Sequence, residues 1–125
     1  MTPQTFLHRQ VHPSWIQQGK ITSQTFKPTP KDQRRLSVYN GDMITPSKAW
    51  DHYTGQLKLQ SRGVVSVTVE ECNKLELNTF EDPEPFPEHA FVDFQVHSNS
   101  AIERKAKLLT RYAEQRGWSY LPLSL

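Results

Sequence analysis

Residues 89–117 read HAFVDFQVHSNSAIERKAKLLTRYAEQRG, and this stretch has the strongest secondary-structure pattern in the chain. Apolar residues alternate with others over 89–97, which is typical of a strand with one buried face. The residues expected on that face are Ala90, Val92, Phe94 and Val96. Ser98-Asn99-Ser100 then predicts the cap of a helix over 101–116, which Gly117 ends. Its apolar residues recur at helical spacing and predict its buried side, namely Ile102, Ala106, Leu109 and Ala113.

Three stretches upstream predict further strands. Alternation over 6–12 indicates a strand that Pro13 ends. RRLSVYNGD, residues 34–42, indicates a strand that turns at Asn40-Gly41, although the return strand is poor. RGVVSVTV, residues 62–69, predicts a central strand with three valines on one face, which are Val65, Val67 and Val69.

Two short helices are expected between these strands. Thr45-Pro46 places a cap and a first-turn proline before a helix that Gly55 ends. Thr68 and Glu71 form a capping-box pattern before another. Together the elements predict a loop-rich α+β fold: a small, mostly antiparallel sheet of about four or five strands, with the C-terminal helix packed on one face. A single domain is expected over 1–125, with residues 1–5 flexible.

Composition limits the classes of function. The chain has 125 residues, 35% of them hydrophobic, a mean hydropathy of −0.70 and nine prolines, as expected for a modest core with much irregular connection. A formal net charge of +2 does not by itself indicate nucleic-acid binding. One cysteine, Cys72, fits a reducing compartment and is expected to be a buried, inert thiol. No signal peptide or membrane-spanning stretch is visible, so a soluble cytoplasmic protein is expected, with no membrane association.

His8 and His12 raise the question of a metal site. On a helix, this spacing would place both rings on one face and allow them to hold one zinc ion. In an extended strand, the same spacing separates the two residues by about 13 Å, too far to chelate one ion. The alternation and Pro13 favour a strand, so no metal site is predicted. His89, Asp93 and His97 form a similar row along a strand face.

Familiar catalytic motifs are missing from the sequence. The five glycines are too dispersed for a phosphate-binding loop or a dinucleotide fingerprint, and there is no nucleophile elbow. No catalytic residues and no cofactor are therefore assigned. The leading hypothesis is a small binding or accessory protein that acts through an unidentified protein partner and has no catalytic activity of its own.

One ordered set of residues offers an enzymatic alternative. Arg9 or His8 lies on the first strand, Ser37 and Tyr39 on a middle strand, and Glu70 at the end of a later one. That order faintly resembles ADP-ribosyltransferase-type domains. The resemblance implies NAD as the cofactor, with Arg9 or His8 orienting the dinucleotide, Ser37 or Tyr39 lining the nicotinamide pocket and Glu70 stabilising an oxocarbenium ion. It covers only these scattered positions.

The segment EDPEPFPEH, residues 81–89, is predicted to be a surface loop, because three prolines exclude a helix or a central strand. Glu84, Phe86 and Glu88 are the candidate partner-binding residues, with Phe86 exposed between prolines. The alternative, given equal weight, is a connector whose Phe86 packs back onto the core.

A basic helix face offers a third interpretation. Arg104, Lys107 and Arg111 align opposite the apolar side of helix 101–116 and would bind nucleic-acid phosphates. A solvated outer face is favoured over this role. The opposed charges of this face and the acidic loop also suggest self-association into a homo-oligomer.

Overall fold

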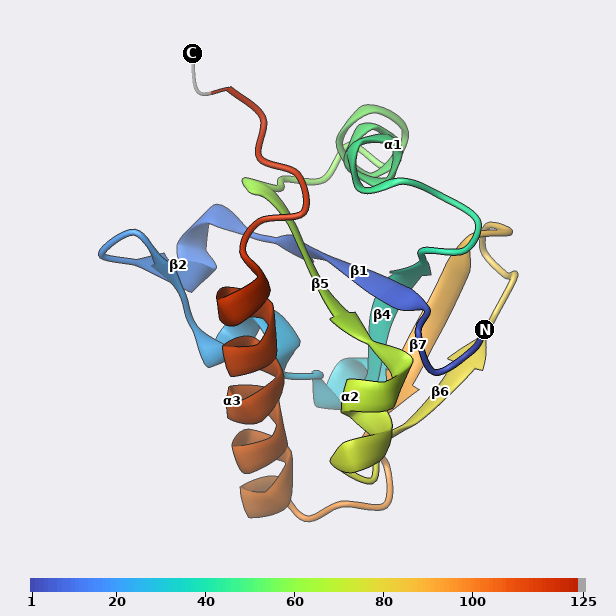
Figure 1. Ribbon diagram of the computed structural model, residues 1–125, viewed down its shortest axis with the longest axis vertical. Helices are drawn as coiled ribbons and strands as arrows, with labels where there is room; N and C mark the ends of the chain where they lie inside the picture. The colour runs from blue at the N-terminus through green and yellow to red at the C-terminus, as the bar shows by residue number, and fades with distance from the viewer. Residues whose placement is uncertain (124–125) are drawn as a thin grey trace.

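The computed structural model describes residues 1–123, and five antiparallel strands form its main sheet in the order β5-β1-β4-β7-β6 (Figure 1). These strands are β1 (Phe6–Val11), β4 (Arg35–Asn40), β5 (Gly63–Thr68), β6 (Asn78–Glu81) and β7 (His89–Asp93). A separate ribbon of β2 (Ile16–Gln17) and β3 (Lys20–Ile21) lies to one side. The predicted α+β, loop-rich architecture is confirmed.

Three α-helices begin at the caps that the sequence predicts. They are α1 (Pro46–Asp51), α2 (Val69–Lys74) and α3 (Asn99–Arg116). Thr68 and Glu71 form both hydrogen bonds of the capping box. Ser98 accepts from the Ala101 N–H, so α3 begins two residues earlier than expected and ends at Gly117. The first helix passes the expected stop at Gly55 and continues as the π-helical turn η4 (His52–Gln56).

Short 3-10 turns complete the connections, namely η1 (Pro13–Trp15), η2 (Ser23–Phe26) and η3 (Pro30–Asp32). The hydrophobic core lies between one face of the sheet and α3, which packs against β5 and η2. Figure 1 shows α3 and α2 on this side. The predicted buried side of α3 is confirmed, because Ile102, Ala106, Leu109 and Ala113 are all buried.

The opposite face of the sheet is only partly covered. Gln10 on β1 donates to the Ala49 carbonyl at 3.1 Å, and the Tyr39 hydroxyl on β4 hydrogen-bonds His52 Nδ1 at 2.8 Å. These bonds place α1 and η4 over β1 and β4, while Phe91 on β7 lines an open hollow. The uncovered part of this face is where a cleft forms.

Two predicted details are wrong. The strand expected over 89–97 ends at Asp93, because its carboxylate accepts from the Gln95 N–H and turns the chain. Phe94 is still buried, but Val96 is 86% exposed. The predicted turn at Asn40-Gly41 does not form a hairpin, since neither residue has positive φ and the Gly41 N–H donates to the Phe6 carbonyl.

The first five residues, expected to be flexible, lie beside the start of α2. Thr5 is buried, and its carbonyl accepts from the Val69 N–H at 3.0 Å. The Pro3 carbonyl likewise accepts from the Glu70 N–H at 2.9 Å. Within residues 1–123, no helix combines the length and apolar character needed to cross a membrane.

Candidate functional site

A cleft of about 550 Å³ lies on the sheet face opposite α3. β1 and β4 form its floor, and η4 and the loop of residues 82–88 form walls. Its residues combine aromatic rings, an arginine and several carboxylates. A shallower hollow of about 270 Å³ adjoins it and shares four lining residues with it, namely Asp32, Ser37, Asp82 and His89.

Arg9 reaches the cleft where β1 and β4 stop pairing. The two strands are paired only at Leu7–Asn40 and His8–Tyr39. Beyond that point the half-buried Arg9 side chain replaces backbone hydrogen bonding: its guanidinium donates to the Ser37 carbonyl at 2.9 Å and to the Thr25 carbonyl at 2.8 Å. It also lies over the Trp15 ring, 5.3 Å from the ring centroid.

No carboxylate among residues 1–123 lies within ion-pairing distance of Arg9. Burial lowers the pKa of Arg9 to about 10, although Tyr53 and Asp32 oppose the change, so the guanidinium is charged at neutral pH. Within residues 1–123, Arg9 forms no ion pair. The structure therefore presents a cation to the cleft whose direct contacts are two carbonyls and an aromatic ring, with the charge of Asp32 farther away.

Aromatic rings packed at tilted or edge-on angles form one wall. Phe86 packs against His52, Tyr39 and His89, with ring centroids 4.5, 5.2 and 5.3 Å apart. Burial, followed by the charges of Tyr53 and Glu88, raises the pKa of Tyr39, which keeps its hydroxyl protonated. Tyr39 is thus a hydrogen-bond donor or acceptor of fixed position in this wall.

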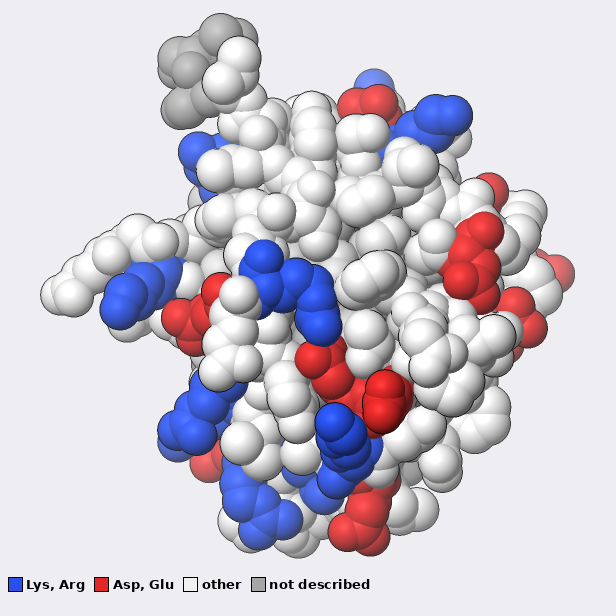
Figure 2. Space-filling model, in the orientation of Figure 1, with Lys and Arg blue, Asp and Glu red and all other residues white. Residues whose placement is uncertain are grey.

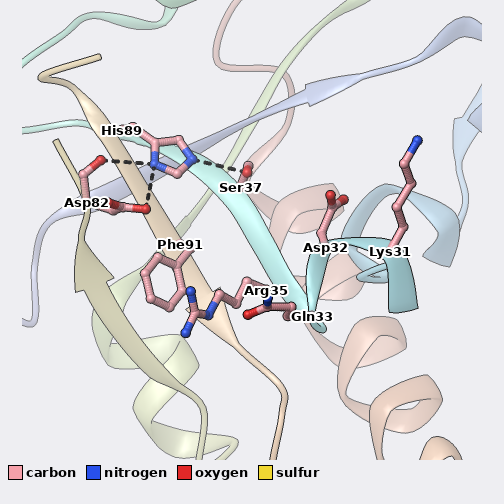
Figure 3. Close-up of a pocket in the computed structure, with 8 residues that line it drawn as sticks. All are labelled: Lys31, Asp32, Gln33, Arg35, Ser37, Asp82, His89 and Phe91. Atoms are coloured by element: carbon pink, nitrogen blue, oxygen red, sulfur yellow. Dashed lines mark hydrogen bonds and ion pairs between the residues drawn. The ribbon is translucent and has the colours of Figure 1, made fainter. Parts of the chain in front are cut away.

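A serine, a histidine and an aspartate lie in line between the two hollows (Figure 3). The Ser37 hydroxyl is 3.1 Å from His89 Nε2. On the other side of the ring, His89 Nδ1 is 3.0 Å from the Asp82 carbonyl and 3.5 Å from Asp82 Oδ2. Ser37 is exposed on β4, and His89 is half-buried on the neighbouring β7.

Three of the four residues in the enzymatic alternative converge. Arg9, Ser37 and Tyr39 all line the cleft. Glu70 does not line it: this exposed residue lies in the first turn of α2. The carboxylates that line the cleft are Asp32, Asp82 and Glu84.

The candidate partner-binding residues have separate positions. Glu84 is exposed and lines the cleft, whereas Phe86 is half-buried in its aromatic wall. Glu88 lines another hollow, next to His52. Phe86 matches neither alternative fully: it is half-buried, and its ring contacts Tyr39 on the sheet face away from the core.

The candidate nucleic-acid-binding residues remain on a solvated face. Arg104, Lys107 and Arg111 are all exposed on α3. Figure 2 shows basic side chains over the region of α3, interspersed with acidic ones. One such neighbour is Glu103, which binds Lys27 Nζ at 3.1 Å.

His8 and His12 form separate hydrogen bonds, each to a different serine. His8 lies on β1 as predicted, is 4% exposed and hydrogen-bonds Ser66 at 2.7 Å. Burial lowers the pKa of His8 to about 4, and the Ile44 carbonyl offsets this only in part. His12 follows the strand and hydrogen-bonds Ser14 at 2.8 Å. No group of three or more His, Cys, Asp or Glu side chains in the described part of the chain is placed to hold a metal ion.

The sequence did not indicate that Asp82 and His89 act together. His89 was placed on a strand face with Asp93 and His97, and Asp82 in a loop. The missing element was β6, which pairs with β7 and brings the Asp82 N–H to the His89 carbonyl at 3.0 Å. Part of the site could have been found from the alternation of apolar and other residues along the two strands. This alternation places Ser37 and His89 on the sheet face away from the core.

No family model, curated protein or solved structure that was compared with this chain matches it. Its function is therefore argued from the geometry of the cleft.

Proposed function

We propose that the protein binds a small organic anion with an aromatic or heterocyclic ring in the cleft, and that a nucleotide of the NAD class is the leading candidate. The position of Arg9 carries this proposal. A half-buried guanidinium with no carboxylate within ion-pairing distance is costly, and an anionic ligand would supply a closer opposite charge. Arginine also matches phosphate and carboxylate oxygens well because its donors form a planar fork.

The walls and size of the cleft support a ring-bearing ligand. Trp15, Tyr39, Tyr53 and Phe86 all line it and offer faces or edges against which a flat ring would pack. A volume of about 550 Å³ lies within the range of roughly 300–1,000 Å³ that is usual for small-molecule sites. The cleft would accommodate a nucleotide-sized ligand rather than a protein segment.

Calorimetric titration with NAD, ADP-ribose, AMP and inorganic phosphate tests the proposal. We expect heat of binding for at least one nucleotide. Arg9→Gln should weaken that binding at least tenfold, and Arg9→Lys should weaken it less because it keeps the charge. The matched control is Arg104→Gln, which removes an exposed arginine on α3. Circular dichroism checks that the variants fold; absence of binding by the folded wild-type protein to all four compounds would reject the proposal.

The NAD hypothesis also predicts which carboxylate takes part in the reaction. Glu70 lies outside the cleft lining, so Glu70→Gln should leave nucleotide binding unchanged. If the protein transfers or hydrolyses ADP-ribose, one of the cleft carboxylates would stabilise the oxocarbenium ion. Glu84→Gln is the first variant to test, with release of nicotinamide from NAD as the measurement.

Docking of a protein partner is a second candidate function. The exposed carboxylate of Glu84, in a loop with three prolines, favours it. Phe86 would contribute little to such docking, since it packs against Tyr39 and His52. This hypothesis would be tested by comparing partner capture by wild-type protein and by Glu84→Lys.

A further inference from the structure

Three hydrogen bonds between serine and histidine side chains occur among residues 1–123. They differ in how exposed the serine hydroxyl is and in whether a carboxylate lies beside the histidine. His8 lines the cleft, but Ser66 is only 1% exposed, so no substrate reaches its hydroxyl. The Ser14–His12 pair is at the surface, but His12 Nδ1 also accepts from the Ser14 N–H and is engaged locally. Only the third pair, Ser37–His89, combines an exposed hydroxyl, a lined hollow and a carboxylate within ion-pairing distance.

Hydrogen bonding fixes the proton of neutral His89 on the ring nitrogen that faces Asp82. The Asp82 carbonyl is only an acceptor, so His89 Nδ1 at 3.0 Å must donate to it. Nε2 then keeps its lone pair and accepts from the Ser37 hydroxyl at 3.1 Å. This is the arrangement in which an imidazole acts as a general base towards a hydroxyl.

Asp82 also supplies charge for the protonated state of the ring. Its Oδ2 is 3.5 Å from His89 Nδ1, and the two side chains lie on one side of Ser37 in Figure 3. When His89 takes up a proton, this carboxylate would stabilise the imidazolium. Asp82 is therefore a positioning residue, and Ser37 and His89 are the groups that meet the substrate.

We propose that Ser37, His89 and Asp82 form a nucleophilic site that hydrolyses carboxylic esters. The Ser37 oxygen bonds to the acyl carbon while its proton moves to His89 Nε2. The ester C–O bond then breaks, and the departing alcohol takes the proton from Nε2. Water next attacks the acyl-serine with His89 again accepting a proton, and this proton returns to Ser37 as the carboxylic acid leaves. The net reaction is ester plus water giving acid plus alcohol.

The hollow beside Ser37 contains hydrogen-bond donors for the negative charge that forms on the carbonyl oxygen. Arg35, Gln33 and Lys31 line the same hollow as Ser37, which also contains the carboxylates of Asp32 and Asp82. Arg35 is held over the Phe91 ring at 4.9 Å from its centroid. A donor from this group that reaches the acyl oxygen would stabilise a developing oxyanion. Esters of small acids would fit a hollow of about 270 Å³, with the alcohol part extending into the larger cleft.

This inference goes beyond the proposed binding function and does not depend on it, because its test uses probes without a nucleotide. A fluorophosphonate should label wild-type protein at Ser37, as located by peptide mass spectrometry. Ser37→Ala should abolish the labelling. The matched control is Ser14→Ala, which removes the other exposed serine of a serine–histidine pair and should leave it unchanged. Labelling elsewhere, or none, overturns the proposal.

Hydrolysis of p-nitrophenyl acetate gives the second readout. His89→Gln should lower kcat by roughly 100-fold or more, because a general base contributes about 10²–10⁴-fold. Asp82→Asn should lower kcat while leaving KM within about twofold, since the Asp82 backbone carbonyl still holds the ring. Equal loss from Ser14→Ala, or an Asp82→Asn effect confined to KM, would contradict the assignment. Nucleotide binding without esterase activity would support only the function proposed above.

Discussion

Glu71 links the first turn of α2 to the end of α3. Burial opposes its ionisation, but hydrogen bonds from Arg116 and Thr68 and the charge of Arg116 outweigh burial and lower the pKa of Glu71. Arg116 reaches both carboxylate oxygens, at 3.0 and 2.9 Å. One side chain therefore completes a helix cap and an ion pair at the same time.

This depressed pKa predicts a loss of stability in acid. The contribution is present above the unfolded-state pKa of about 4.3 and disappears as pH falls through the lower folded-state pKa. Glu71→Gln should lower the free energy of unfolding at pH 7 by about 1 kcal/mol. The difference from wild type should shrink at pH 3, as measured by urea unfolding. Glu114→Gln, at an exposed site on α3, is the control; a difference that grows in acid would contradict the prediction.

Cys72 is predicted to be unreactive in the folded protein. Burial, and secondarily the charge of Glu71, raises the pKa of its thiol to about 12, so almost no thiolate exists at neutral pH. Iodoacetamide should alkylate Cys72 in urea but leave it largely unmodified in native buffer, as followed by intact mass. Rapid alkylation of native protein would show that the thiol is accessible.

α3 covers one face of the sheet with a row of buried apolar side chains. Leu109 is fully buried in the core cluster, and the sheet presents mainly valine and leucine side chains to it. Removing part of that side chain would leave a cavity rather than admit water. The helix is thus held by packing more than by its own propensity.

Leu109→Ala should lower the free energy of unfolding by about 2–5 kcal/mol, the usual range for such a truncation in a packed core. Lys107→Ala, on the exposed side of the same helix, should change it by less than about 0.5 kcal/mol. Urea unfolding monitored by tryptophan fluorescence measures both. Equal effects would mean that α3 does not pack as described.

Elements with local signals were predictable, and those that depend on distant contacts were not. α3 followed from its cap, its spacing and Gly117. β6 has a sequence, NTFE, without alternation of its own and exists because β7 pairs with it. β7 was predicted too long because Val96 continues the pattern beyond the turn made by Asp93.

At the scale of the whole molecule, the cleft is a product of topology. Arg9, Ser37 and Tyr39 could be selected from the sequence by strand order and residue type. Their convergence with Asp82 and His89 required the placement of β4 between β1 and β7. The sequence thus allowed individual candidate residues to be chosen. It did not allow the alignment of Ser37, His89 and Asp82 to be predicted.

The distribution of charge over the surface leads to a further prediction. Arg104, Lys107 and Arg111 are exposed, but acidic residues such as Glu103 and Glu114 lie among them on α3. We expect only weak binding to generic DNA and RNA, with a shallow dependence of log K on log salt concentration between about 50 and 200 mM. A steep slope that Lys107→Gln reduces would instead favour the nucleic-acid hypothesis.

The two edge strands of the sheet, β5 and β6, are protected in different ways from pairing with a strand of another molecule. On β5, Val64 pairs with Tyr120, so the C-terminal segment occupies part of that border. On β6, the border is four residues long and leads into a segment with prolines at 83, 85 and 87, which lack N–H donors. A neighbouring molecule would find few free amides with which to extend the sheet. The chain can therefore keep Phe80 at its surface without offering a template for fibril growth.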